Sequence, residues 1–227
     1  MSTVGACGEL RYMNTNFRID FGEYDLIYYI CYMKNVVFDL GRVVFAQDPA
    51  KSTDEFKQFF SYVAQRQMPQ FWCDYDRGVL SLSEVAEALA AYRGVEVGYA
   101  TEMIHKAIGR QESIKPTAEL IKDLKAAGYK LYVLSNMSSD FIEFLRKQPV
   151  YSHFDGEVIS CEEGVVKPMP EIYDILLNRY HLDPQQTIFI DDREENVIAA
   201  EQKGISTFHF NRNNYEESCE QLRNMLL

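Results

Sequence analysis

The sequence contains few of the features that mark secreted, membrane-spanning or nucleic-acid-binding proteins. Its five cysteines are odd in number and show no Cys-x-x-Cys spacing, which argues against a disulfide framework or a zinc site and favours a reducing, cytoplasmic location. No apolar run approaches the roughly 18 residues that span a bilayer. With 34 acidic against 23 basic residues, no basic field exists that would attract a nucleic acid or an anionic membrane.

Apolar residues are plentiful, and they fall into several segments. Of 227 residues, 47% are hydrophobic and 13% aromatic, enough for one large domain or for a core domain with a smaller inserted one. Residues 1–32 lack the basic start of a signal peptide. They precede Met33-Lys34 and the first core strand, so we interpret them as an upstream extension and Met33 as the natural start of the chain.

The periodicity of the remaining residues predicts an α/β fold. Residues 35–38 form a short run that is apolar at nearly every position, typical of a strand buried on both faces of a parallel sheet. After residue 114, strands alternate with helices, which indicates βαβ units. We predict a Rossmann-like parallel sheet core, residues 33–46 and 114–227, covered by helices on both faces. Residues 47–113 contain no expected strand and predict a small all-helical cap, with capping boxes at residues 52–55 and 81–84.

Polar residues stand at the predicted carboxyl ends of successive strands. Taken singly, each has an ordinary structural explanation: a turn, a helix cap, complementation of a helix dipole or a solvated loop lysine. Carboxyl ends of parallel strands meet at one edge of the sheet, where ligands bind in such folds. The residues concerned are Asp39, Ser135-Asn136 and Asp191-Asp192, with Lys167-Pro168 in the loop before a crossover helix.

In this order, these residues resemble the motifs of the haloacid dehalogenase (HAD) superfamily, most of whose members are magnesium-dependent phosphatases. The resemblance covers about residues 34–210, and the place of the helical insertion is similar to that of the small cap of the phosphoglucomutase and dehalogenase-like branch. The four motifs are Phe38-Asp39-Leu40-Gly41, Leu134-Ser135-Asn136, Val166-Lys167-Pro168 and Phe189-Ile190-Asp191-Asp192, the last followed by Asn196.

The resemblance implies a role for each motif residue. Asp39 would attack phosphorus and form an aspartyl-phosphate, which divides one difficult hydrolysis into two easier transfers. Mg²⁺ would be held by oxygen atoms, and Lys167 would neutralise the nucleophile and a phosphoryl oxygen. Clustered carboxylates without a cation should repel and raise a pKa. The implied metal set is Asp39, the Gly41 carbonyl and Asp192, with Asp191 as a support or an additional ligand; the implied substrate contacts are Ser135, Asn136 and Arg42.

One position departs from the family pattern. Two residues after the nucleophile most family phosphatases carry an Asp that serves as general acid and base, whereas this chain has Gly41, as in a bacterial branch of sugar-phosphate phosphatases. Such proton transfer contributes about 10²–10⁴-fold to rate. A cap residue would have to replace it, and Arg42 cannot because guanidinium does not deprotonate in proteins.

The cap offers two further groups with two interpretations each. The aromatic residues Phe71, Trp72 and Tyr75 are either the core of the cap, which is the more common case, or a platform for substrate. The polar residues Asp74, Asp76 and Arg77 are either contacts for sugar hydroxyl groups or, more often, parts of a solvated loop.

The sequence therefore predicts a Mg²⁺-dependent phosphatase acting on a small phosphorylated metabolite, with a sugar phosphate favoured. Two alternatives stay open: a metal-independent 2-haloacid dehalogenase, for which Asp191-Asp192 has no clear use, and a catalytically silent HAD-like binding protein, suggested by Gly41. No oligomeric state is predicted.

Overall fold

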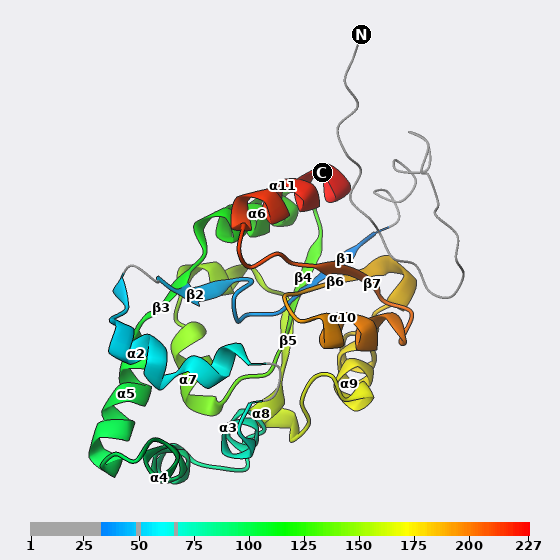
Figure 1. The fold of residues 1–227 in the computed structure, drawn as a ribbon. Coiled ribbons are helices and arrows are strands. Elements are labelled where there is room, and N and C mark those ends of the chain that lie inside the picture. The colour runs from blue at the N-terminus through cyan, green and yellow to red at the C-terminus, as the bar shows by residue number, and fades with distance from the viewer. Residues whose placement is uncertain (1–32, 49–50, 66–67) are drawn as a thin grey trace.

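A computed structural model describes residues 33–48, 51–65 and 68–227, so the predicted upstream extension, residues 1–32, lies outside the described residues. At its centre is a five-stranded sheet with strand order β5-β4-β1-β6-β7, in which all neighbouring strands are parallel (Figure 1). The strands are β1 (Asn35–Phe38), β4 (Lys130–Ser135), β5 (Gly156–Ile159), β6 (Thr187–Asp191) and β7 (Ser206–His209).

Helices cover both faces of this sheet, because alternate residues of each buried strand point to opposite faces. Val36 and Phe38 of β1 belong to a core shared with α6, α7 and α11, whereas Val37 belongs to a second core shared with α9 and α10. The predicted Rossmann-like architecture is thereby confirmed. The helices are α6 (Lys115–Ala126), α7 (Ser139–Leu145), α9 (Pro170–Tyr180), α10 (Glu194–Glu201) and α11 (Tyr215–Leu226), with the short α8 (Ser160–Glu163) after β5.

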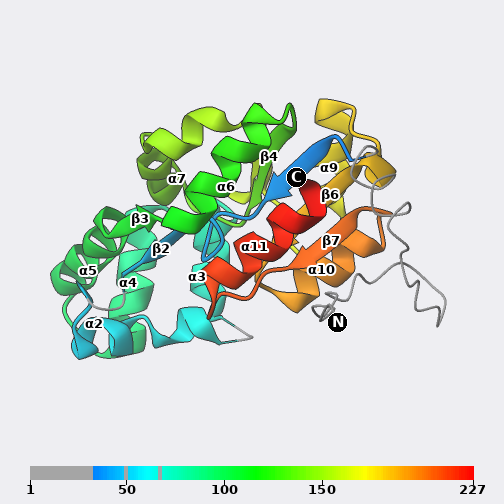
Figure 2. The same ribbon diagram turned by 90° about the horizontal axis from the view of Figure 1, so that it is seen from above.

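Four α-helices in the described part of residues 48–110 form what we call the helical insertion. They gather at one side of the sheet (Figures 1 and 2) around a separate aromatic-rich core that includes Tyr62, Trp72 and Tyr75. The burial of Trp72 and Tyr75 supports the interpretation of the aromatic segment as core. The helices are α2 (Asp54–Phe59), α3 (Gln70–Asp76), α4 (Leu82–Arg93) and α5 (Val97–Gly109).

The prediction that residues 47–113 contain no strand is wrong at both ends of that range. Strand β2 (Phe45–Gln47) pairs antiparallel with β3 (Gln111–Ser113), where the chain leaves the sheet core and returns to it. Three-residue strands with polar residues carry no periodic signal, and the pairing arises because the two crossing segments lie side by side.

The two predicted capping boxes have different outcomes. At α4, Ser81 accepts a hydrogen bond from the Glu84 amide, and the Glu84 carboxylate accepts one from the Ser81 amide at 2.8 Å, as predicted. At α2 the cap is Thr53, whose Oγ1 accepts from the Phe56 amide at 3.2 Å, so this helix begins one residue later than expected. Within the described part of the chain, no helix is long and apolar enough to cross a membrane.

Candidate active site

The structure brings the strand-end residues together at one edge of the sheet. Asp39 follows β1, and its amide donates to the Ile190 carbonyl of β6 at 2.9 Å. The parallel register pairs Phe38 with Val133 on one side and with Ile190 on the other. The ends of β1, β4 and β6 are therefore level, and their carboxyl-terminal side chains share one site.

Lys167 is the cation at the centre of this site. Its ammonium group donates to Asp39 Oδ1 at 2.8 Å, to Asp191 Oδ2 at 2.6 Å and to the Leu134 carbonyl at 2.8 Å. These three bonds use every proton of the ammonium, and its side chain is only 1% exposed. A charge buried to this extent is stable only when it is fully paired and hydrogen-bonded, so Lys167 is locked in one position.

Asn136 holds the loop that carries Lys167. Its side-chain oxygen accepts from the Lys167 amide at 2.7 Å, and its side-chain nitrogen donates to the Lys167 carbonyl at 2.9 Å. The sequence predicted Asn136 as a substrate contact. The structure gives its amide group a different partner at both ends, the main chain of Lys167, and so makes it a residue that positions the lysine.

Three carboxylates form the acidic part of the site. Oxygen atoms of Asp39, Asp191 and Asp192 all lie within 4.8 Å of one another. Asp39 Oδ1 accepts from Ser135 Oγ at 2.9 Å in addition to Lys167. Asp191 accepts from Lys167, from the Arg193 amide at 2.8 Å and from Asn196 Nδ2 at 3.0 Å.

The pKa values of this cluster reflect burial and like charge. Burial raises the pKa of Asp191 to about 7; Lys167 opposes the shift, and the charge of Asp39 adds to it. The pKa of Asp192 is also raised, again first by burial and then by Asp39. The expected upward shift is present, with burial as its larger cause. For Lys167, burial lowers the pKa, but the charges of Asp191 and Asp39 outweigh it and the net shift is upward.

The donor set is suited to a hard divalent cation. Asp39 Oδ2 and Asp192 Oδ1 accept no hydrogen bond from the described residues, whereas both oxygens of Asp191 are engaged. Oxygen atoms from one or two carboxylates are the ligands that Mg²⁺ prefers in proteins. A bound cation would also relieve the repulsion that raises the pKa values of Asp191 and Asp192.

The turn after β1 places Gly41 and Arg42 beside these carboxylates. The Leu40 carbonyl accepts from the Val44 and Phe45 amides at 2.9 and 2.8 Å, which closes the turn. Arg42, at φ 60°, is affected by the charge of Asp192, and its contact with substrate stays a prediction. A Cβ at Gly41 would lie 3.9 Å from Asp39 Oδ2, an ordinary contact, and the position is open.

Sequence reasoning missed one cation of the site. Arg212 donates to Asp192 Oδ2 at 2.9 Å and approaches from the loop that follows β7. The sequence could have indicated Arg212 as a site residue, because its loop follows a strand end at the same edge of the sheet as the other site residues. Asn196, noted only as part of the fourth motif, contacts both oxygens of Asp191.

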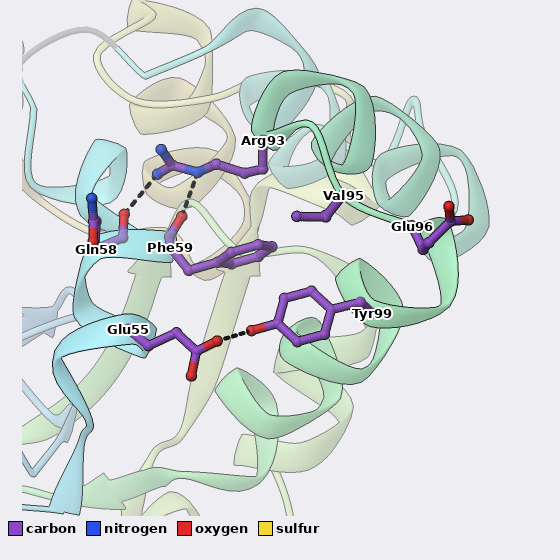
Figure 3. A pocket seen from close by; sticks show the side chains of 7 residues that line it. All are labelled: Glu55, Gln58, Phe59, Arg93, Val95, Glu96 and Tyr99. Atoms are coloured by element: carbon purple, nitrogen blue, oxygen red, sulfur yellow. Dashed lines mark hydrogen bonds between the residues drawn. The ribbon is translucent and has the colours of Figure 1, made fainter.

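The pocket drawn in Figure 3 belongs to the helical insertion and is distinct from this site. Glu55 accepts a hydrogen bond from Tyr99 at 2.6 Å across it, and Arg93 donates to the Phe59 carbonyl at 2.8 Å. Its lining contains none of the strand-end residues: Glu55, Gln58, Phe59, Arg93, Val95, Glu96 and Tyr99.

Comparison with known proteins yields relatives of closely similar length. The chain is 25% identical over 194 residues to a sesquiterpene phosphatase from Aspergillus oryzae, covering 85% of this chain and 96% of the relative. It is 25% identical over 190 residues to a D-ribitol-5-phosphate phosphatase from Bacteroides thetaiotaomicron, covering 78% and 91%.

Solved structures agree with these relatives. A HAD-like hydrolase from Porphyromonas gingivalis superposes with a TM-score of 0.67 at 26% identity, over 85% of this chain and 98% of that one. A HAD family enzyme from Bacteroides thetaiotaomicron in complex with magnesium and inorganic phosphate gives a TM-score of 0.65 at 25% identity, over 80% and 96%. The family model for haloacid dehalogenase-like hydrolases matches residues 69–204, more than half of the chain. The resemblance predicted from the four motifs is thereby confirmed: this chain belongs to the haloacid dehalogenase-like hydrolase family.

Proposed function

We propose that the protein is a Mg²⁺-dependent phosphatase that hydrolyses a small phosphorylated metabolite through an aspartyl-phosphate on Asp39. The observation that supports this proposal most directly is the hydrogen bonding of the two oxygens of the Asp39 carboxylate. One oxygen is fixed by Ser135 and Lys167, and the other accepts no hydrogen bond from the described residues. A carboxylate held at one oxygen and free at the other is oriented for attack.

The protein's own groups provide most of the electrostatic support for this attack. As the phosphoryl group passes to Asp39 Oδ2, negative charge spreads over its oxygens. Lys167 bonds the same carboxylate and is close enough to neutralise one of these oxygens. The Ser135 hydroxyl donates its proton to Asp39 Oδ1 and so holds the nucleophile in place, and Arg42 and Arg212 place positive charge on the Asp192 side. Because these groups are fixed before substrate arrives, they stabilise the transition state without reorganising.

Asp192 Oδ1 accepts no hydrogen bond from the described residues and is open to a cation. Asp39, Asp192 and the Gly41 carbonyl would hold Mg²⁺. Asp191 has its oxygens committed to Lys167, Asn196 and the Arg193 amide, so it acts as the anchor of the lysine. When bound, the cation would screen the repulsion between Asp39 and a phosphate dianion. The helical insertion would act as the cap that excludes water before the aspartyl-phosphate forms.

A sugar or polyol phosphate is the substrate class that we favour. The relatives named as phosphatases of D-ribitol 5-phosphate and of phosphorylated carbohydrates span most of the chain, as does the sesquiterpene phosphatase. An isoprenoid phosphate is therefore the competing substrate class. The dehalogenase alternative shares the fold, but a metal-free mechanism gives no use to the clustered Asp192.

A phosphate-release screen tests the proposal. Purified protein is assayed with Mg²⁺ against polyol, sugar and isoprenoid monophosphates, alongside Asp39→Asn as the matched control. We expect release from at least one class by the wild type, none by Asp39→Asn, and loss on adding EDTA with recovery on restoring Mg²⁺. Halide release from 2-haloacids that persists in EDTA would establish the dehalogenase alternative, and inactivity of both proteins across the panel would favour a silent binding protein.

A further inference from the structure

We propose that Asp76, at the end of α3 in the helical insertion, is the general acid and base that Gly41 cannot supply. This inference rests on the proposed phosphatase function. In the first step Asp39 bonds to phosphorus, the bond from phosphorus to the leaving oxygen breaks, and that oxygen takes the proton of the Asp76 carboxyl group. In the second step water attacks phosphorus, the Asp76 carboxylate takes a proton from that water, and the Asp39 carboxylate is released.

The site described above has no other side chain for this task. Lys167 has all three protons committed, Asp191 is saturated by its donors, and Asp192 is paired with Arg212. An acid must therefore come from the opposite side, where the helical insertion faces the strand ends. Asp76 meets this requirement, because its backbone is bonded to Ser160, which in turn is bonded to the loop that follows Ser135.

The backbone of Asp76 is fixed to the core next to the nucleophile. Its carbonyl accepts a hydrogen bond from the hydroxyl of Ser160, which is fully buried. The same hydroxyl oxygen accepts from the Met137 amide at 2.9 Å. Met137 lies two residues after Ser135, whose own hydroxyl bonds Asp39. A short chain of contacts thus connects the end of α3 with the reacting carboxylate.

Two further contacts fix α3 on either side of Asp76. Tyr75 donates to Asp140 Oδ2 at 2.8 Å. Gly78, at φ +77°, packs so closely that an added Cβ would lie 2.4 Å from the Cys161 carbonyl oxygen. Only glycine combines this conformation with this approach. The acid is therefore presented from a rigid junction between insertion and core, as proton transfer requires.

The Asp76 carboxyl group itself has no hydrogen-bond donor among the described residues, although it is only partly exposed. Asp74, two residues earlier, is different: it accepts from Gln70 Nε2 at 2.9 Å and lies 3.9 Å from an Arg77 nitrogen. Asp74 therefore has its partners on and next to α3, and it lies in a helix and not in the predicted solvated loop. One carboxyl of α3 is thus satisfied locally, and the other is left available to substrate.

The environment of Asp76 also suits a proton donor at neutral pH. Burial raises the pKa of Asp76 to about 8; Arg193 at the start of α10 opposes the shift, and Asp39 adds to it. Other titratable groups near it include Tyr62, Cys73, Tyr75 and Arg77 of the insertion and Cys161 of α8. A general acid works best when its pKa lies near the working pH.

The test compares two leaving groups. An alkyl phosphate such as glycerol phosphate needs a proton on its leaving oxygen, whereas p-nitrophenyl phosphate releases a stable phenolate. We expect Asp76→Asn to lower kcat/KM for the alkyl ester by about 10²–10⁴-fold and to change that for the aryl ester far less. Asp74→Asn is the matched control and should leave both close to wild type, while Asp39→Asn abolishes both. The fall in wild-type activity on the alkaline side of pH 8 should disappear in Asp76→Asn.

A second variant tests whether the lost group is a proton donor. Because Gly41 has room for a side chain beside Asp39 Oδ2, Gly41→Asp places a carboxyl where most family phosphatases carry one. Added to Asp76→Asn, it should restore activity toward the alkyl ester. Equal losses on both esters, or no loss on either, from an active wild type would overturn the role of Asp76 alone. A wild type inert toward every phosphate ester would overturn the proposed function and this inference with it.

Discussion

Replacing Lys167 by Met should destabilise the folded protein strongly, because the change removes a buried charge and preserves much of the side-chain volume. It leaves the carboxylates of Asp39 and Asp191 buried without their cation, at positions where the lysine bonded them at 2.8 and 2.6 Å. Removing one partner of a buried ion pair costs about 3–5 kcal/mol. For a protein of this length that corresponds to a fall in Tm of about 6–20 °C.

Lys203 provides a matched control elsewhere in the chain. It also makes a lysine–aspartate contact of 2.6 Å, with Asp174, but the two side chains are 24% and 49% exposed. Solvated pairs of this kind contribute about 0–1 kcal/mol, so Lys203→Met should lower Tm by a few degrees at most. The two lysine–aspartate contacts differ in burial, so the comparison isolates the effect of burial on the loss of stability.

The pH dependence gives the Lys167 prediction a second measurement. The folded-state pKa of Asp191 is already raised to about 7, and loss of the lysine that opposes the shift raises it further. A carboxyl group with a raised pKa favours the folded state while it is protonated, and this contribution is lost as pH rises through the folded-state pKa. The Tm difference between wild type and Lys167→Met should therefore be smaller at pH 5 than at pH 8. Equal losses for Lys167→Met and Lys203→Met, or a gap that does not change with pH, would refute the reasoning.

Three further predictions concern the metal, the junction and the acid. Mg²⁺ at 100 times its dissociation constant should stabilise the fold by about 2.7 kcal/mol, seen as a Tm shift that Asp192→Asn abolishes. Gly78→Ala should destabilise the folded protein by at least about 1–2 kcal/mol because of its left-handed φ alone, and the close contact with Cys161 adds to this loss. An added Cβ at Gly98 meets no atom within 4 Å, so Gly98→Ala should be neutral or slightly stabilising. Thermal melts of the two variants distinguish these outcomes. Asp76→Asn should be more stable than wild type at pH 8, with the difference vanishing toward pH 4, because the raised pKa of Asp76 makes its ionisation unfavourable in the folded state; equal stability at both pH values would contradict this.

The sheet and its edge could be predicted from the sequence because their signals are local. Residues 35–38 are apolar at nearly every position, and the next polar residue, Asp39, marks where the strand ends. Three such ends in a parallel sheet must come together, which is why Asp39, Ser135 and Asp191 could be placed at one edge without coordinates. Lys167 lies on a loop and was added to them through the family motif. Helix ends were less secure: α2 is capped by Thr53, one residue later than the predicted capping box at residues 52–55.

The partners of the site residues could not be predicted, because they depend on contacts between distant segments. Asn136 has a polar side chain suited to contact substrate, yet its amide group binds the main chain of Lys167, 31 residues away. Arg212 reaches Asp192 from the last loop of the sheet. Neither pairing leaves a trace in local periodicity, since both depend on how the loops fold over the sheet edge.

The same reasoning explains why Asp76 and Asp74 look alike in sequence and differ in structure. Both are acids on one short helix. Asp74 accepts a hydrogen bond from Gln70 of the same helix, whereas the Asp76 carboxyl has no donor among the described residues and its backbone is docked on Ser160 of α8. An acid on the β1 turn, where this chain has Gly41, would be present whether or not the insertion covers the site. An acid on α3 is present only when Ser160 and Gly78 hold the insertion against the core. Under the proposed role of Asp76, the proton therefore comes from the docking of the insertion on the core and not from the turn that carries the nucleophile.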